Sequence, residues 1–311
     1  MRRLIADIGG TNARFALVGD DGLPTGIRTL RVADHPGLVE AAAAYLDGHQ
    51  VDEAVIAVAT PVETDRISFT NSPWSFLIPD ARERLGVARL AVINDFVAQA
   101  LAVPHLQPHE REQIGGGEPL PDRPVGVIGA GTGLGVAGLI QVGDTSIVLA
   151  TEGGHASLAP GTARERALLE RMAARYGHVS KERAISGPGL LAIAQALAEV
   201  DGVATAAATP EAVTRAAHDG TCPVCREALG MFSALLGSAA GDLALTYGAR
   251  GGIYLAGGVC LGMGAIFDRQ LFRERFEAKG RMHRYLEPIP TFLITRGDTG
   301  LLGAARHRIP D

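Results

Sequence analysis

Lysine is almost absent from this 311-residue chain, whose two lysines are Lys181 and Lys279. This scarcity excludes a Walker A loop, which needs a lysine after its glycines. It also excludes the strand lysine that protein kinases carry near the N-terminus. A nucleotide bound by this chain would therefore have its phosphates held by backbone N–H groups.

Cysteine is scarce as well. The three cysteines cannot form a disulfide framework, and they fit a reduced, cytosolic compartment. Cys222 and Cys225 form a single Cys-X-X-Cys pair, with His218 just upstream. A zinc site would need a fourth ligand, and the sequence offers no second pair. Two free thiols in a loop is the interpretation that we favour.

Long apolar runs and an excess of positive charge are also missing. No stretch reaches about 18 uncharged apolar residues, so no membrane span is predicted. Asp7 interrupts the first apolar run too early for a signal peptide. The net charge of −5 and the pI near 6.0 favour neither a nucleic acid nor an anionic membrane as a partner.

The composition, 47% hydrophobic and 20% charged, suffices for two domains with proper cores. Two α/β halves are expected, because "DIGGTNARFALVG" and "GAGTGLGVAGLIQVG" both predict a strand, a Gly/Thr turn and a second strand. We place the junction near residue 105. Residues 1–105 plus 296–311 are expected to form a small α/β domain, and residues 106–295 a large one. The strand "GGIYLAGGV" is expected to lead into a helix that ends in "FRERFEAKG".

The segment "GLGVAG", residues 133–138, formally matches the dinucleotide-binding fingerprint. We reject that interpretation, because the fingerprint must open a helix, whereas the following "VAGLIQV" predicts a strand. The glycines suit a hairpin turn whose consecutive N–H groups form an anion-binding concavity. An ordinary glycine hairpin is the alternative.

The segment "DIGGTNAR" combines an acid with a second glycine turn. Asp7 ends a predicted strand, and Gly9 and Gly10 make the turn. An acid beside a phosphate-holding turn can orient Mg²⁺ or its water shell. Arg14 is either a phosphate partner or one half of a salt bridge between strands.

Two further features predict anion-binding positions. The turn "LAGGV", residues 255–259, ends a strand and precedes a helix. Ser186 is a predicted N-cap with Pro188 early in the helix, so the start of that helix is another pole for an anion.

The segment "LAVINDFVAQALAV", residues 90–103, places Asn94 and Asp95 where a buried strand passes into a helix. Open α/β sheets bind their ligands at the carboxyl ends of strands. Asp95 can be interpreted in two ways, as a helix cap or as a functional carboxylate.

Taken together, the motifs resemble the bacterial ATP-dependent glucokinase family. The resemblance rests on "DIGGTNARFAL", "VINDFVAQA", "GAGTGLGVA", "EGGHASLAP", "ERAISGPGL" and "LAGGV", and it covers nearly the whole chain. It implies an α/β, two-domain actin-like ATPase (ribonuclease H-like) fold, with a cleft between a smaller and a larger domain. The implied reaction is transfer of a phosphoryl group from Mg-ATP to the 6-hydroxyl of glucose.

The resemblance also implies which residues form the site. Asp95 is the expected general base, because a carboxylate within hydrogen-bond reach can take the hydroxyl proton. Asp7 is the expected Mg²⁺ residue, directly or through water. The expected glucose contacts are Asn71, Asn94, Asp95, Glu152, His155 and Glu182. The expected ATP contacts are Ala6, Asp7, Ile8, Gly9, Gly10, Thr11, Asn12, Gly131, Thr132, Gly133, Gly257 and Gly258.

Several alternatives remain open from the sequence. A sugar-responsive repressor of the related kinase-like group would carry an N-terminal helix-turn-helix, and the first strand near Leu4 leaves no room for one. A filament-forming or chaperone ATPase would not need the Asn94-Asp95 and Glu152/His155 pairs. Mannose, fructose or an amino sugar could replace glucose, and ADP or polyphosphate could replace ATP. The expected partners are glucose and ATP, in a cytoplasmic homodimer.

Overall fold

The computed structural model describes residues 2–69, 72–205 and 207–309. The chain divides into two compact units. Unit 1 comprises Met1–Gln107 and Arg296–Asp311, and unit 2 comprises Pro108–Thr295. The chain crosses from one unit to the other at Gln107/Pro108 and at Thr295/Arg296, where the sequence analysis expects a junction near residue 105 and a return at residue 296.

Unit 1 is built on a five-stranded sheet in the order β3-β2-β1-β4-β7. The strands are β1 (Arg3–Ile8), β2 (Asn12–Val18), β3 (Pro24–Arg31), β4 (Glu53–Val58) and β7 (Arg89–Asn94), with a separate hairpin of β5 (Arg66–Ser68) and β6 (Ser75–Leu77). The α-helices are α1 (Leu38–Leu46), α2 (Ile78–Leu85), α3 (Asp95–Ala102) and α12 (Thr299–Arg306). Short 3-10 helices span Val32–Asp34 and Val103–His105.

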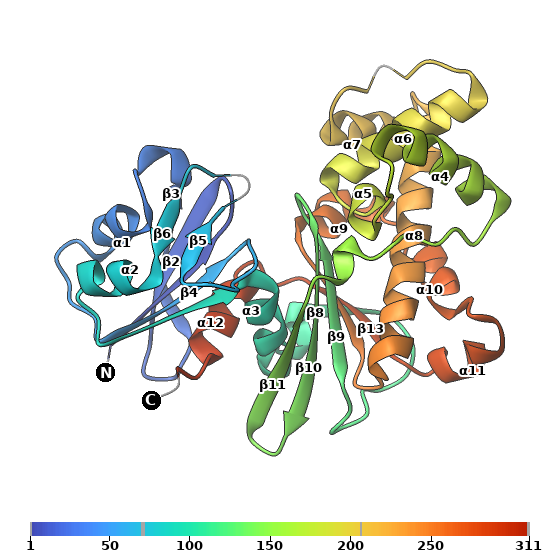
Figure 1. The fold of residues 1–311 in the computed structure, drawn as a ribbon. Helices are drawn as coiled ribbons and strands as arrows, with labels where there is room; N and C mark the ends of the chain where they lie inside the picture. The colour runs from blue at the N-terminus through green and yellow to red at the C-terminus, as the bar shows by residue number, and fades with distance from the viewer. Residues whose placement is uncertain (1, 70–71, 206, 310–311) are drawn as a thin grey trace. The chain divides into compact units, whose positions relative to one another are not determined.

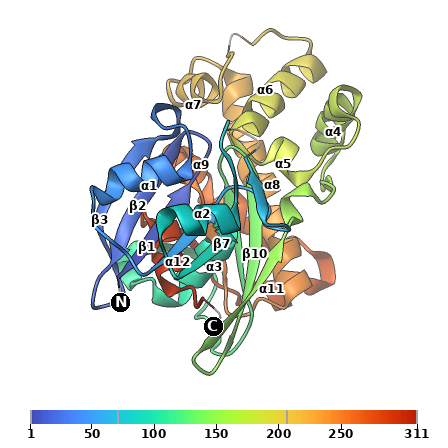
Figure 2. The ribbon, with the colours of Figure 1, turned by 60° about the vertical axis from the view of Figure 1, so that its left-hand side comes forward.

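The alternation of β1 assigns its two faces. Leu4, Ala6 and Ile8 point to one face and join a buried cluster with residues of α1, among them Tyr45. Asp7 points to the other face, where α12 packs against β1. Figures 1 and 2 show α1 and α2 on one side of this sheet and α3 and α12 on the other. Asp7, the polar residue between Leu4 and Ile8 of β1, therefore faces α12, the C-terminal helix.

Unit 2 is built on a six-stranded sheet in the order β11-β10-β9-β12-β13-β8. The strands are β8 (Arg111–Gly115), β9 (Val125–Ala130), β10 (Leu134–Val142), β11 (Thr145–Thr151), β12 (Ile253–Ala256) and β13 (Thr291–Ile294). The α-helices are α4 (Ala163–Tyr176), α5 (Lys181–Ala184), α6 (Gly187–Asp201), α7 (Pro210–His218), α8 (Pro223–Tyr247), α9 (Gly258–Met263), α10 (Arg269–Glu277) and α11 (His283–Leu286). Short 3-10 helices span Pro108–Glu110, Gly153–His155, Gly264–Ile266 and Gly280–Met282.

The two sheets repeat one strand pattern. In unit 1, β1 is antiparallel to β2 and parallel to β4, which is parallel to β7. In unit 2, β9 is antiparallel to β10 and parallel to β12, which is parallel to β13. Strand β8 is an addition at the far edge of the second sheet. The internal repeat of architecture predicted from the two Gly/Thr turns is confirmed.

The single helix expected after β12 is wrong. The structure has α9, a 3-10 turn and then α10, and the break falls at Gly264. Gly264 has φ 55°, a conformation that a glycine adopts without the steric cost of a Cβ. Asp268 then starts α10 afresh, because its Oδ1 accepts a hydrogen bond from the Leu271 N–H at 2.8 Å.

Helix α8 is the core helix of unit 2. It packs against α6, α7 and α10 (Figure 1). By length and composition it could cross a membrane, but 72% of its most apolar window is buried inside the protein. Burial of this kind is what a helix hydrophobic on all sides shows at the centre of a folded unit.

Candidate active site

The Asn94-Asp95 pair lies at the carboxyl edge of the unit 1 sheet. Strands β1, β4 and β7 are parallel, and Asn94 ends β7 in register with Val58 at the end of β4. Asn94 is the N-cap of α3, because its Oδ1 accepts the Phe96 N–H at 2.8 Å. Its Nδ2 donates to the Thr60 carbonyl at 3.2 Å. Asn94 is thus held from both ends of its amide.

Asp95 is therefore the first residue of α3 and not its N-cap. Its Oδ1 shares the Phe96 N–H at 2.9 Å. Since Asn94 already supplies the cap, helix capping alone does not account for a carboxylate at position 95.

The first glycine turn, Gly9-Gly10, joins β1 to β2 at the same edge of the sheet. The Gly9 N–H donates to the Asn12 carbonyl at 3.0 Å and closes the turn. Asp7 lies one residue before the end of β1, so the strand runs one residue further than the sequence predicts. The edge thus presents a tight turn, a carboxylate and the Asn94-Asp95 pair.

Asp7 is enclosed by two partners. Arg14 lies opposite it on β2, with Nη1 3.4 Å from Asp7 Oδ2, so the salt-bridge interpretation of Arg14 is confirmed. Gly300, at the start of α12, leaves room for the carboxylate, because a Cβ there would lie 2.8 Å from it. Burial raises the pKa of Asp7, and the positive charge of Arg14 acts in the opposite direction. A cation at this position would favour the ionised carboxylate.

The second glycine turn, Gly131 to Gly133, joins β9 to β10 in unit 2 as the predicted hairpin. The Gly131 N–H donates to the Gly133 carbonyl at 2.9 Å and closes the turn, and two further hydrogen bonds attach the turn to α5 and α6. The Leu134 N–H donates to Glu182 Oε2 at 2.9 Å, and the Gly187 N–H donates to the Gly131 carbonyl at 2.8 Å. A Cβ at position 133 would lie 2.5 Å from Glu182 Oε2, whereas a Cβ at Gly131 would meet nothing within 4 Å.

The third turn, Gly257-Gly258, lies beside the end of β9. Gly257 has φ 84°, and a Cβ there would overlap the Ala130 carbonyl oxygen. Since β9 and β12 are parallel, their carboxyl ends meet at one edge of the sheet. Ser186 caps α6 as predicted, because its Oγ accepts the Gly189 N–H at 3.0 Å. Two glycine turns and a helix N-terminus therefore gather at this edge.

Glu152 and His155 follow β11 and lie in the segment that approaches the second glycine turn, Gly131 to Gly133. Glu152 follows this strand, and His155 ends the short 3-10 helix after it. His155 Nε2 lies 3.8 Å from Glu152 Oε2, and both side chains are more than half exposed. Gly154 allows the close approach, because a Cβ there would overlap the Leu134 carbonyl oxygen. The segment that carries Glu152 and His155 and the side chain of Glu182 thus both lie beside the start of β10.

The predicted glucose contacts are divided between the units. Asn94 and Asp95 belong to unit 1, while Glu152, His155 and Glu182 belong to unit 2. Asn71 lies outside the described residues. The sequence analysis missed Gly300, whose only signal is a glycine in the first turn of a predicted helix.

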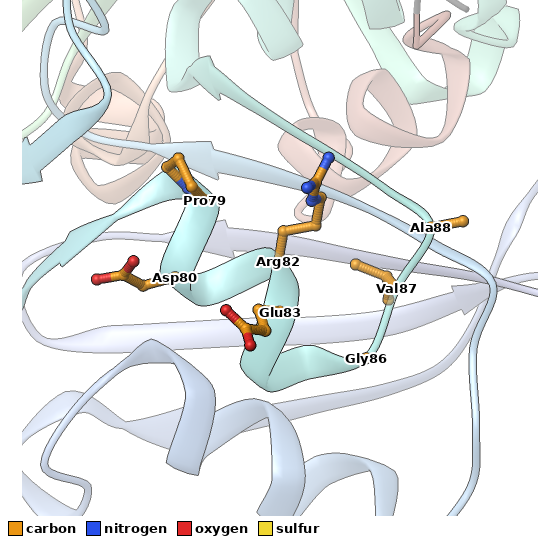
Figure 3. Close-up of a pocket in the computed structure, with 7 residues that line it drawn as sticks. All are labelled: Pro79, Asp80, Arg82, Glu83, Gly86, Val87 and Ala88. Carbon is orange, nitrogen blue, oxygen red and sulfur yellow. The ribbon is translucent and has the colours of Figure 1, made fainter.

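No group of three or more His, Cys, Asp or Glu side chains within residues 2–69, 72–205 and 207–309 is placed to hold a metal ion by itself. A cavity of about 430 Å³ opens on α2 and the turn after it. Figure 3 shows the acidic side chains of Asp80 and Glu83 projecting away from the Arg82 guanidinium. None of the predicted site residues lines this cavity.

Comparisons with known proteins identify the family of the chain. The glucokinase family model matches residues 4–309. A glucokinase from Aromatoleum aromaticum is 50% identical over 97% of this chain and 93% of its own. The crystal structure of a glucokinase from an Antarctic psychrotroph has a TM-score of 0.89, with 37% identity and 98% of both chains covered.

A more distant structure shows the same fold. A ROK family glucokinase from Streptomyces griseus, in complex with glucose and AMPPNP, has a TM-score of 0.63 at 22% identity, with 98% of both chains covered. The predicted α/β class and actin-like ATPase fold are confirmed. The chain belongs to the glucokinase family.

Proposed function

We propose that this member of the glucokinase family transfers the γ-phosphoryl group of ATP to the 6-hydroxyl of glucose, with Asp95 as the general base. The products are glucose 6-phosphate and ADP. The proposal rests on the start of α3. Asn94 caps this helix, so the neighbouring Asp95 supplies a carboxylate that capping does not require.

The chemistry needs a base at this point. A primary hydroxyl is a poor nucleophile, and a carboxylate within hydrogen-bond reach takes its proton as the phosphoryl group arrives. Asn94 is held by Phe96 and Thr60, so it provides a fixed amide beside that carboxylate. Most of the remaining catalysis is the correct positioning of the two substrates.

The sugar would be recognised by neutral and acidic hydrogen-bonding groups. Glucose is ringed with hydroxyls, which carboxylates, amides and imidazoles bind well. We assign Asn94, Asp95, Glu152, His155 and Glu182 to it, and Asn71 by resemblance alone. Because Glu182 also accepts the Leu134 N–H, a sugar hydroxyl on Glu182 would be linked to the second glycine turn.

The phosphates would be held by the backbone of the turns. The main support for this assignment is Gly131, because the space beside its Cα is open. No lysine near this turn in the sequence could hold the phosphates instead. Oriented N–H groups of glycine turns and helix N-termini bind anions. The remaining ATP positions, assigned by resemblance, are Ala6, Asp7, Ile8, Gly9, Gly10, Thr11, Asn12, Thr132, Gly133, Gly257 and Gly258.

The residues present fit a magnesium ion that arrives with ATP. Mg²⁺ is usually bound by one or two carboxylates together with substrate phosphates and water, and Asp7 offers such a carboxylate beside the first turn. Bound there, the ion would neutralise charge on the phosphoryl oxygens. Asp7 would hold it directly or through water, and Arg14 and Gly300 would fix the carboxylate.

Donor, sugar range, assembly and compartment are proposed from the family. The glucose and AMPPNP bound to the Streptomyces griseus enzyme are the ligand types that we propose for this chain. A coupled assay with mannose, fructose and amino sugars, and with ADP and polyphosphate, measures the selectivity. A cytoplasmic homodimer rests on the resemblance alone, and sedimentation measures its mass.

The experiment for Asp95 is the substitution Asp95→Asn. An asparagine keeps the size and can accept the Phe96 N–H, so the thermal midpoint should stay within a few degrees. Turnover should fall roughly a hundredfold or more, the usual scale for loss of a positioned base. Glucose binding should survive in part, because the amide still bonds to a hydroxyl.

Asp80→Asn is the matched control. It makes the same change in the first turn of another helix of unit 1, on an exposed side chain. Turnover of this variant should remain normal. Full activity of Asp95→Asn, with its fold intact, would refute the base assignment.

A further inference from the structure

The Cys-X-X-Cys pair does not lie in a loop, as the sequence suggests, but opens the 25-residue helix α8. Cys222 is the N-cap, and its Sγ accepts the Cys225 N–H at 3.2 Å. Cys225 lies one helical turn further on, and Pro223 occupies the first helical position between them. This is the arrangement in which a thiolate gains from the helix N-terminus.

The two thiols differ in environment. Cys222 is half-buried, whereas Cys225 is fully buried and lies 3.9 Å from Thr205 Oγ1. Partial burial raises the pKa of the Cys222 thiol, but the surrounding donors, among them the Cys225 N–H, outweigh burial and lower the pKa overall. Burial and the neighbouring Cys222 side chain raise the pKa of Cys225 to about 11.

A cavity gives a reagent access to this pair. Its volume is about 650 Å³, and both cysteines line it together with Val203, Thr205 and Ala212. It lies between the end of α6, α7 and the start of α8. A cavity of this size is in the range that binds small organic molecules.

We propose that Cys222 and Cys225 form a redox-active dithiol site that a low-molecular-weight disulfide of the glutathione class oxidises. The Cys222 thiolate attacks one sulfur of the reagent, the S–S bond breaks, and one thiolate leaves and takes a proton from water. The Cys225 thiol then loses its proton to solvent and attacks the Cys222 sulfur, releasing the second thiolate. The dithiol gives up two electrons to the reagent, and an intramolecular disulfide results.

Cys260 provides an internal comparison. It is buried in α9, and burial raises its pKa to about 12. A structural cysteine of this kind reacts slowly, because the thiolate is the nucleophile. The proposal therefore predicts that Cys222 reacts at least about tenfold faster than Cys260 in the folded protein.

The test exposes the full-length protein, with a chelator present, to oxidised glutathione and follows its intact mass and peptide map. The wild type and Cys260→Ser should both lose the mass of two hydrogens and yield a Cys222–Cys225 peptide. Cys225→Ser should stop at a stable adduct of one glutathione on Cys222, and Cys222→Ser should stay unmodified. Circular dichroism shows whether each variant is folded.

Two results would overturn the proposal. One is wild-type protein that retains three free thiols across the range of glutathione potentials. The other is modification of Cys260 as fast as Cys222 in folded protein. If Cys225→Ser fails to fold, mapping of the wild-type disulfide and of its reversal by dithiothreitol decides the question on its own.

Discussion

Gly131 has room beside it that the protein itself does not fill. A Cβ at Gly131 would meet no atom within 4 Å, although the neighbouring Gly133 has no such space. At Gly133 a Cβ would displace the Glu182 carboxylate that accepts the Leu134 N–H. An open position in a tight turn, held on both sides by hydrogen bonds, is what a bound phosphate would need.

Substitution of Gly131 by valine should therefore affect ATP and not the fold. The KM for ATP should rise about tenfold or more, because the valine side chain would crowd the phosphates. Displacement that breaks one charge-assisted hydrogen bond to them costs roughly 1.5–3 kcal/mol, and each 1.4 kcal/mol is a factor of ten. Steady-state kinetics with ATP varied, beside a thermal midpoint, is the measurement. Gly262→Val, at another open glycine of unit 2, should leave KM alone. Unchanged ATP kinetics in folded Gly131→Val would remove this turn from the site.

At the scale of residues, the sequence predicts what is local. The Ser186 cap and the salt bridge of Arg14 with Asp7 both join residues that are close in the sequence. For Arg14, the sequence also allowed a role as phosphate partner. The contact of Gly300 with Asp7 joins the two ends of the chain, so no local pattern announces it. The capping role of Asn94 was missed, because Asn and Asp cap helices equally well and the pair is adjacent.

At the scale of elements, helices α8 and α10 of unit 2 pack with their backbones close together. Gly237 and Gly241 of α8 face the backbone of α10, and a Cβ on either would overlap a carbonyl oxygen, that of Phe272 or of Phe276. Small residues on one helix let the backbones approach, and a side chain there would have to push a whole helix away.

Gly237→Ala should therefore destabilise unit 2 even though alanine favours helices. Overpacking costs about 1–3 kcal/mol, and this cost exceeds the roughly 1 kcal/mol gained in helix propensity when the obstacle is backbone. Gly230→Ala is the control in the same helix. Its Cβ would meet only Leu271 at 3.7 Å, an ordinary contact, so it should stabilise by about 0.5–1 kcal/mol. Urea unfolding measures both, and equal effects of the two variants would contradict this packing argument.

The sequence predicts strongly patterned elements well and weakly patterned ones poorly. Strands β1, β4 and β9 and the hairpin of β9 and β10 follow from apolar runs and glycine turns. Strand β3, which is mostly exposed, was missed because it lies at the sheet edge and has little apolar alternation. Helix α2, short and rich in charge, was missed for a similar reason. The break at Gly264 depends on a backbone conformation that no side-chain pattern reveals.

At the scale of the whole molecule, two copies of one sheet topology divide the proposed site. The resemblance of "DIGGTNARFALVG" to "GAGTGLGVAGLIQVG" was enough to predict this repeat, because each segment specifies an antiparallel pair of strands, β1 with β2 and β9 with β10. The repeat does not predict where β8 or the helices between β11 and β12 pack, because unit 1 has no counterpart of them.

The proposed glucose contacts come from both units. If Asn94 and Asp95 of unit 1 bind the same sugar as Glu152 and His155 of unit 2, glucose would bridge the two units and fix their relative position. The hinges would be the two chain crossings at Gln107/Pro108 and Thr295/Arg296. Small-angle scattering should show a smaller radius of gyration with saturating glucose. The control is His155→Ala at a glucose concentration at which calorimetry detects no binding to this variant. Its radius of gyration should not change when glucose is added. An identical distance distribution with and without bound glucose in the wild type would mean that the units do not close on the sugar.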